Sequence, residues 1–140
     1  MRKMKISFFL LSLSFLVNSC EVYHEKLVGD YYLDVHESRT DMTIVYVSEE
    51  GYRVGLMRPT VFAVGYNKQF IIIKQHPNHI RNGINRSITN YYIVPVENPV
   101  SRALDENVVG PLTKVEFEHA RQEMAIPENL DFTIVFEDLE

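Results

Sequence analysis

The sequence predicts an α+β domain, with a mainly antiparallel sheet of about six to seven short strands and one helix in the C-terminal half packed on it. Two observations carry this prediction. Short runs of alternating apolar and polar residues recur along the chain, separated by turn-forming residues. One late segment instead repeats its apolar residues at helical spacing. The order of the strands does not follow from these observations.

The predicted strands rest on period-2 patterning and β-branched content. The run Phe-Ile-Ile-Ile at 70–73 is apolar on both faces and predicts a central strand covered on each side. Asn67-Lys68 predicts the turn of a hairpin, because Asn tolerates a positive φ. We expect strands over residues 31–36, 42–48, 52–57, 61–66, 69–75, 87–95 and 130–136, with loops over 76–86 and 97–110.

The predicted helix begins after Thr113. Glu116 follows three residues later, which is the spacing of a capping box that satisfies free N–H groups at a helix start. Phe117, Ala120 and Met124 recur at helical spacing and are expected to face the sheet.

Composition excludes several classes of protein. The chain has 140 residues, of which 46% are hydrophobic, and this content argues against disorder. A single cysteine excludes an internal disulfide framework and a cysteine-rich zinc site. The formal net charge of −5 argues against a nucleic-acid binder, which normally carries a basic stripe.

The N-terminus has the pattern of a secretory signal. Three basic residues within the first five precede an apolar segment over residues 6–17, which is too short for the roughly 20 residues of a membrane-spanning helix. The stretch Leu16-Val17-Asn18-Ser19-Cys20 resembles a bacterial lipobox. The resemblance implies that Cys20 becomes the first residue of the mature chain and carries acyl chains such as palmitate. A secreted protein with a free thiol at Cys20 is the alternative.

Cleavage before Cys20 defines the expected organisation: a signal peptide over residues 1–19, a lipid-anchored tether over 20–28 and one globular α+β domain over 29–140. Loss of three of the 14 basic residues leaves 11 against 19 acidic, a formal net charge of −8. Such a domain is expected to be repelled by anionic lipid. We expect it to be attached to a membrane of the bacterial cell envelope, periplasmic or surface-facing, by a tether whose last eight residues extend to roughly 25 Å.

Two groups of residues are candidates for a metal site or a catalytic site. His76 and His79 are three residues apart and are candidate metal ligands, but Pro77 lies between them and basic residues surround them. Asp34 and His36 share a predicted strand face, as in part of a hydrolytic triad, but no nucleophile motif accompanies them. We expect an exposed histidine pair in a polar loop and a solvated strand face. No catalytic residue, metal or cofactor is therefore predicted.

The charged clusters are expected to be solvated surface. The carboxylates lie around the first connections, at Glu37, Asp41, Glu49 and Glu50. The basic residues lie around the long loops, at Lys74, Arg81, Arg86 and Arg102. Contact of the basic group with an anionic partner is the alternative.

Tyrosines are the least ordinary feature. The pairs Tyr31-Tyr32 and Tyr91-Tyr92 each place one ring on either side of a strand, so one ring of each pair is expected to point outward. Exposed tyrosine supplies large, rigid contact area. We take Tyr32, Tyr66 and Tyr92 as a candidate binding surface, with half-buried tyrosines of a thin sheet as the alternative.

The segments FAVGYNKQFIIIKQHP, TNYYIV and GPLTKVEFEHARQ resemble a family of uncharacterised small bacterial lipoproteins, over nearly the whole mature domain. The resemblance implies an envelope location and a single compact domain, and no site residues.

Three functional hypotheses follow. The first is a non-enzymatic binding or accessory module, anchored to the membrane by its lipid, with an envelope protein as partner. A narrower version is an inhibitor or immunity-like lipoprotein, because a net charge of −8 suits capture of a basic secreted enzyme. The third is a small envelope hydrolase or metal-dependent enzyme that uses the histidines or the Asp34 face.

Overall fold

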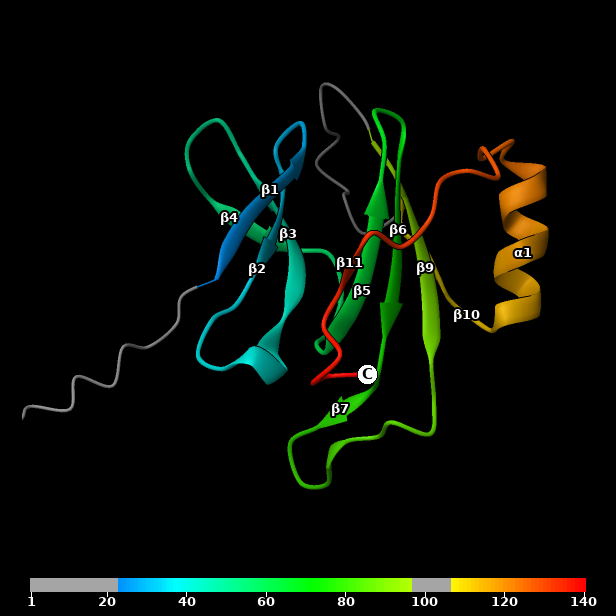
Figure 1. Ribbon diagram of the computed structural model, residues 1–140. Coiled ribbons are helices and arrows are strands. Elements are labelled where there is room, and N and C mark those ends of the chain that lie inside the picture. The colour runs from blue at the N-terminus through cyan, green and yellow to red at the C-terminus, as the bar shows by residue number, and fades with distance from the viewer. Residues whose placement is uncertain (1–22, 97–106) are drawn as a thin grey trace, which may run out of the picture.

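A computed structural model describes residues 23–96 and 107–140 (Figure 1). The four-stranded sheet has the order β1 (His24–Val28), β2 (Tyr31–Asp34), β3 (Thr43–Val47), β4 (Arg53–Gly55). The five-stranded sheet has the order β10 (Val109–Leu112), β9 (Asn90–Pro95), β6 (Phe70–Gln75), β5 (Val61–Tyr66), β11 (Ile134–Val135). The other elements are η1 (Arg39–Asp41), the hairpin of β7 (Asn78–His79) and β8 (Gly83–Ile84), and α1 (Lys114–Glu123). No helix in these two ranges is long and apolar enough to span a bilayer.

The described part of the chain forms three layers: the four-stranded sheet, the five-stranded sheet and α1 (Figure 1). The main core lies between the two sheets, where Leu33 and Ile44 of one sheet join Val64, Ile71 and Ile73 of the other, all fully buried. Burial of each such side chain contributes about 1.5–3 kcal/mol. The prediction of a mostly antiparallel α+β fold with one helix is confirmed at this level.

Strand β6 is central, as its two-sided apolar run predicts. It lies third in the five-stranded order, between β9 and β5. Ile71 and Ile73 enter the core between the sheets, whereas Ile72 points to the opposite face and packs in the cluster of Phe117.

Helix α1 begins at the predicted capping box. The Thr113 backbone N–H donates to Glu116 Oε2 at 2.7 Å, and the Glu116 backbone N–H donates to Thr113 Oγ1 at 3.3 Å. Phe117 is buried against Tyr91, with 4.9 Å between ring centroids, and Ala120 and Met124 pack around it. The helix therefore covers the five-stranded sheet with its predicted face.

The strand count and the single sheet were wrong. The described residues contain eleven strands in three sheets, because the chain crosses from one layer to the other after β4. The Val61 N–H donates to the Met42 carbonyl oxygen at 2.8 Å, so β5 starts beside the beginning of β3 and continues in the second sheet. Strands β7, β8 and β11 have two residues each, which is too short for an alternating pattern to reveal.

The hairpin between β5 and β6 is confirmed, but its turn works differently. Asn67 has no positive φ, since Ala125 is the one non-glycine residue in the described ranges that does. Instead, Asn67 Oδ1 accepts hydrogen bonds from the backbone N–H groups of Gln69 and Phe70, both at 2.8 Å. The side chain thus closes the turn by an Asx-type contact.

Several predicted boundaries shift. Residues 24–28, expected as tether, form β1, because Leu27 is buried in the main core and the strand pairs with β2. Part of the expected 97–110 loop is β10, which pairs with β9. The last predicted strand, 130–136, shortens to β11 because Leu130 turns into the cluster under α1. The signal peptide, Cys20 and Arg102 lie outside the described residues.

Candidate functional site

The two histidines that are candidate metal ligands, His76 and His79, lie in different environments. His76 is buried at the end of β6, stacked on Phe62 with 4.1 Å between ring centroids, and its Nδ1 lies 2.7 Å from the Ile88 carbonyl oxygen. His76 Nε2 has no partner within the described part of the chain. His79 is exposed in β7. The expectation of an exposed pair is therefore wrong for His76, because its ring fills space beside Phe62.

Asp34 is also buried rather than solvated. It is 7% exposed and accepts from His24 Nδ1 at 2.9 Å and from Arg53 Nη1 at 3.0 Å. His36, its expected neighbour, is exposed. Pairing of β2 with β1 places His24 directly across from Asp34, and β3 lies between Asp34 and β4, which carries Arg53. The partners of Asp34 thus come from strands on either side of β2, on one face of the sheet.

Tyr32 lies on the same outward face, and its ring contacts two side chains of β1. Its ring stacks on His24 with 4.5 Å between centroids and an interplanar angle of 8°. Lys26 Nζ lies 5.8 Å from the Tyr32 centroid, within the range of a cation–π contact. Val45 pairs with Tyr32 across β2 and β3 and is buried on this face. We name this surface the Tyr32 face, and it comprises His24, Lys26, Tyr32, Asp34, Val45 and Arg53.

The Tyr32 face follows from alternation in two strands. Tyr31 and Leu33 point into the core, so Tyr32 and Asp34 point out. The helix packs on β9 and β10 of the other sheet, so no described helix covers this face (Figure 1).

Tyr23 fixes the start of β1, which carries two residues of the Tyr32 face. Its carbonyl oxygen accepts from the Val35 N–H at 3.0 Å, and its ring meets Phe136 edge-on with 5.6 Å between centroids. The hydroxyl of Tyr23 donates to Glu25. Burial, together with this carboxylate, raises the pKa of Tyr23 to about 12. Tyr23 is therefore part of the folded domain.

The Tyr32 face is suited to binding. A stacked ring has lost its rotamer freedom before any partner arrives, which lowers the entropic cost of association. Lys26 and Arg53 supply donors for carbonyl or carboxylate oxygens, and Asp34 compensates one of these charges. Within residues 23–96 and 107–140, no three His, Cys, Asp or Glu side chains gather as a metal site.

The three predicted tyrosines do not form one surface. Tyr32 lies in the four-stranded sheet, and Tyr66 is 36% exposed at the end of β5 in the other. Tyr92 is 9% exposed and belongs to the core between the sheets, because both faces of β9 are covered. Burial raises the pKa of its hydroxyl, against an opposing effect of Arg58. The expectation that Tyr92 points outward was wrong.

The charged clusters are also dispersed. Lys74 Nζ lies 4.6 Å from the ring centroid of Phe132, and Arg86 donates to the carbonyl oxygens of Asp138 and Glu140. Arg81 is exposed beyond β7. These three do not make one basic patch, because each contacts a different segment.

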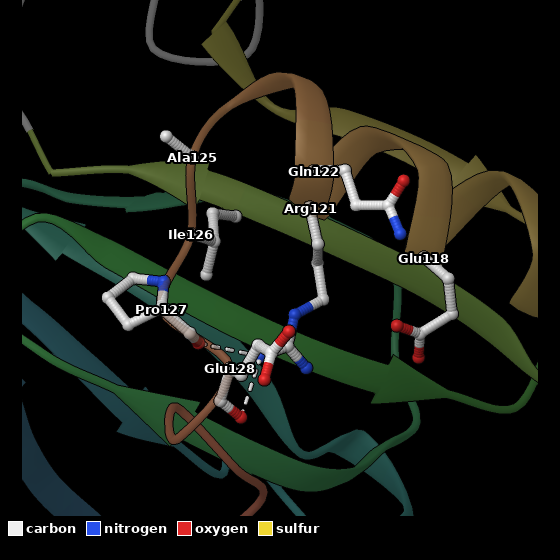
Figure 2. Close-up of a pocket in the computed structure, with 7 residues that line it drawn as sticks. All are labelled: Glu118, Arg121, Gln122, Ala125, Ile126, Pro127 and Glu128. Atoms are coloured by element: carbon white, nitrogen blue, oxygen red, sulfur yellow. Dashed lines mark hydrogen bonds between the residues drawn. The ribbon is translucent and has the colours of Figure 1, made fainter.

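One depression lies at the C-terminal end of α1 (Figure 2). It has a volume of about 580 Å³, and Arg121 points into it between the carboxylates of Glu118 and Glu128. Arg121 Nη2 donates to the carbonyl oxygens of Pro127 at 2.9 Å and Leu130 at 2.8 Å. Its guanidinium is thus occupied in fastening the helix end to the following segment, which is a structural role.

A second depression of about 390 Å³ lies beside the β7–β8 hairpin, and it is lined by Arg58, Asn78, His79, Ile80, Arg81 and Asn82. Its lining contains no carboxylate, in a chain with 19 acidic residues.

Sequence reasoning missed His24, Lys26 and Arg53. His24 and Lys26 fall in the segment taken as a tether, and Arg53 reaches Asp34 from a strand 19 residues away. The segment His-Glu-Lys-Leu-Val at 24–28 does not alternate apolar and polar residues, so no local pattern indicated a strand there.

Comparison with known proteins identifies the family to which the chain belongs. Neither the search of curated proteins nor that of solved structures found a match. A family model described as protein of unknown function (DUF3997) matches residues 28–139, from the end of β1 to the last residue but one. The chain therefore belongs to the DUF3997 family of proteins of unknown function.

Proposed function

We propose that the protein is a lipid-anchored, non-enzymatic binding module of the bacterial envelope, and that it contacts an envelope protein through the Tyr32 face. The observation that carries the proposal is the stack of Tyr32 on His24, at 4.5 Å and 8°, on a sheet face that no described helix covers. Lipidation of Cys20 rests on the lipobox resemblance of residues 16–20.

The composition of the Tyr32 face supports protein binding. Tyrosine and arginine are enriched among the residues that dominate binding energy, and aromatic rings bury large area at low entropic cost. The cations Lys26 and Arg53 favour a partner that presents carboxylates or free carbonyl oxygens. A basic secreted enzyme is a poor complement to this surface, so the inhibitor hypothesis gains no support from it.

The test places an aromatic photo-crosslinking amino acid, whose ring can keep the stack on His24, at position 32 of the full chain, expressed in its own envelope. The matched control position is Val115, which is 80% exposed on α1 in the opposite layer. We expect a discrete crosslinked species from position 32 and none from position 115. Substitution His24→Ala, which removes the stack, should reduce that species about tenfold or more, in line with loss of one important contact.

Two outcomes contradict the proposal. One is equal crosslinking from positions 32 and 115, which signals random contact. The other is the absence of any crosslinked species from position 32 while the chain is present in the membrane fraction at its normal level.

A further inference from the structure

Tyr23, which belongs to the folded domain, lies close in sequence to the proposed anchor. Tyr23 is held by Val35 and Phe136, and it lies three positions after Cys20 in the sequence, with two residues between them. Three residues span at most about 10 Å. The sequence-based tether was expected to end at residue 28, but β1 takes residues 24–28 into the domain. A lipid on Cys20 would therefore hold the domain against the membrane surface.

Contacts show which end of the domain lies near residue 23. Phe136 touches Tyr23 and also the guanidinium of Arg39, whose carbon lies 5.3 Å from the ring centroid. The carbonyl oxygen of the adjacent Thr40 accepts from Asn78 Nδ2 of β7 at 3.3 Å. η1, the C-terminal segment and the β7–β8 hairpin thus lie at one end, at the bottom of Figure 1, and the start of β1 is joined to it through the contact of Tyr23 with Phe136. We name it the hairpin end.

The hairpin end carries an exposed apolar tip beside cations. Ile80 is fully exposed at the turn between β7 and β8. Arg58, His79 and Arg81 line the neighbouring depression of about 390 Å³. Neither arginine side chain makes an ion pair with any residue of the described ranges. An isoleucine at a turn is solvated at a cost, and two unpaired arginines beside it attract anions.

Two of the carboxylates at this end are engaged, whereas Glu137 and Glu140 are exposed in the C-terminal segment. Asp138 pairs with Arg39 at 2.9 Å, and Asp41 accepts from the Ser38 N–H at 3.1 Å. None of these carboxylates lines the depression beside Ile80, so that lining carries cations and no acidic side chain although the end as a whole also carries acidic residues.

We propose that the hairpin end binds an anionic phospholipid bilayer, with Ile80 inserted at the acyl boundary and Arg58 and Arg81 against headgroup phosphates. The inference rests on the proposed lipidation of Cys20, which supplies the proximity. An acyl anchor combined with a basic patch holds a protein more firmly than either alone. The orientation leaves the Tyr32 face on the side of the sheet, free for a protein partner.

The experiment uses the full chain with Ile80→Cys, expressed in a bacterium and recovered in membranes. Cys20 is the one native cysteine, so a lipidated wild-type chain offers no thiol. The new thiol is labelled with an environment-sensitive dye. The matched control is Val115→Cys, exposed on α1 in the layer farthest from the four-stranded sheet. Thermal unfolding of each variant confirms that it folds like wild type.

After reconstitution in phosphatidylglycerol vesicles, we expect blue-shifted emission and several-fold protection from iodide at position 80, and water-like emission at position 115. Phosphatidylcholine vesicles should reduce the shift. Arg58→Gln and Arg81→Gln should each lower the membrane-contacting fraction, about fivefold when that fraction is small, as expected for loss of one cation near an anionic surface.

The outcomes separate the two proposals. Dye on the wild-type chain means a free Cys20 and overturns the lipid anchor. An unlabelled wild type with water-like emission at position 80 overturns the membrane contact alone. Equal shifts at positions 80 and 115, or equal shifts in both lipids, also overturn it. Protection that appears only after addition of soluble envelope proteins assigns the hairpin end to a protein and overturns the lipid proposal.

Discussion

Gly65 is the position where the smallest substitution should have a large effect. It lies in β5, opposite Ile72, where the segment leading to β11 crosses the strand. A Cβ atom at Gly65 would lie 2.0 Å from the carbonyl oxygen of Asp131 and 2.8 Å from its carbonyl carbon. Both are backbone atoms, so relief requires the crossing segment to move by more than 1 Å, roughly the shortfall from ordinary contact distance.

That movement breaks other contacts. Thr133 donates from its N–H to the Val64 carbonyl oxygen at 3.1 Å, and Leu130 is buried under α1. Overpacking of this kind costs about 1–3 kcal/mol, and a weakened backbone hydrogen bond adds about 1 kcal/mol. We expect Gly65→Ala to lower the free energy of unfolding by about 2–4 kcal/mol, a fall in melting temperature on the order of 10 °C for a domain of this size.

Urea and thermal denaturation followed by circular dichroism measure the change. The matched control is Gly55→Ala in β4, where an added Cβ meets nothing within 4 Å. That substitution should be neutral or slightly stabilising, because alanine restricts the unfolded chain. Equal stability of the two variants would refute the reasoning that the C-terminal segment packs directly on β5.

Three further predictions concern single side chains. Asp34→Ala should destabilise the domain by about 1–3 kcal/mol in urea denaturation, because two charge-assisted hydrogen bonds are lost. The control Asp138→Ala removes an exposed ion pair and should cost no more than about 1 kcal/mol. Tyr23 keeps its proton to about pH 12 in the folded state, while the unfolded chain ionises near 10.0, so stability should fall by up to about 2–3 kcal/mol as pH rises between these values. Tyr23→Phe should remove that fall and the latest tyrosine transition in an ultraviolet titration. The backbone N–H of Thr113, and after it the Thr113 side chain, lower the pKa of Glu116, so the stability that these contacts supply is present above the ordinary glutamate pKa and is lost as pH falls through the lowered value. Thr113→Ala should cost about 1 kcal/mol and reduce that acid dependence.

Local patterns predicted the elements whose own residues determine them. The run at 70–73 indicated the central strand because both faces of β6 are covered, and the capping box located the start of α1. Alternation in 31–34 placed Tyr31 in the core and Tyr32 outside it.

Features that depend on contacts with distant segments were not predicted from the sequence. Tyr92 has the same local pattern as Tyr32, but the other sheet covers it, and no residue near position 92 reports that packing. Asp34 acquires its two partners from strands 10 and 19 residues away. The segment 24–28 became a strand because β2 supplies its hydrogen-bonding partner, whereas its five residues alone were too few to indicate one.

Lipidation of Cys20 is the claim on which the envelope anchor and the hairpin-end proposal depend, and intact-mass analysis of the protein extracted from membranes tests it directly. The account predicts a chain that starts at Cys20, lacks residues 1–19 and carries the added mass of thioether-linked diacylglycerol. The added mass should disappear with Cys20→Ser. A mature chain that starts elsewhere, or that starts at Cys20 with an unmodified thiol, would contradict the account.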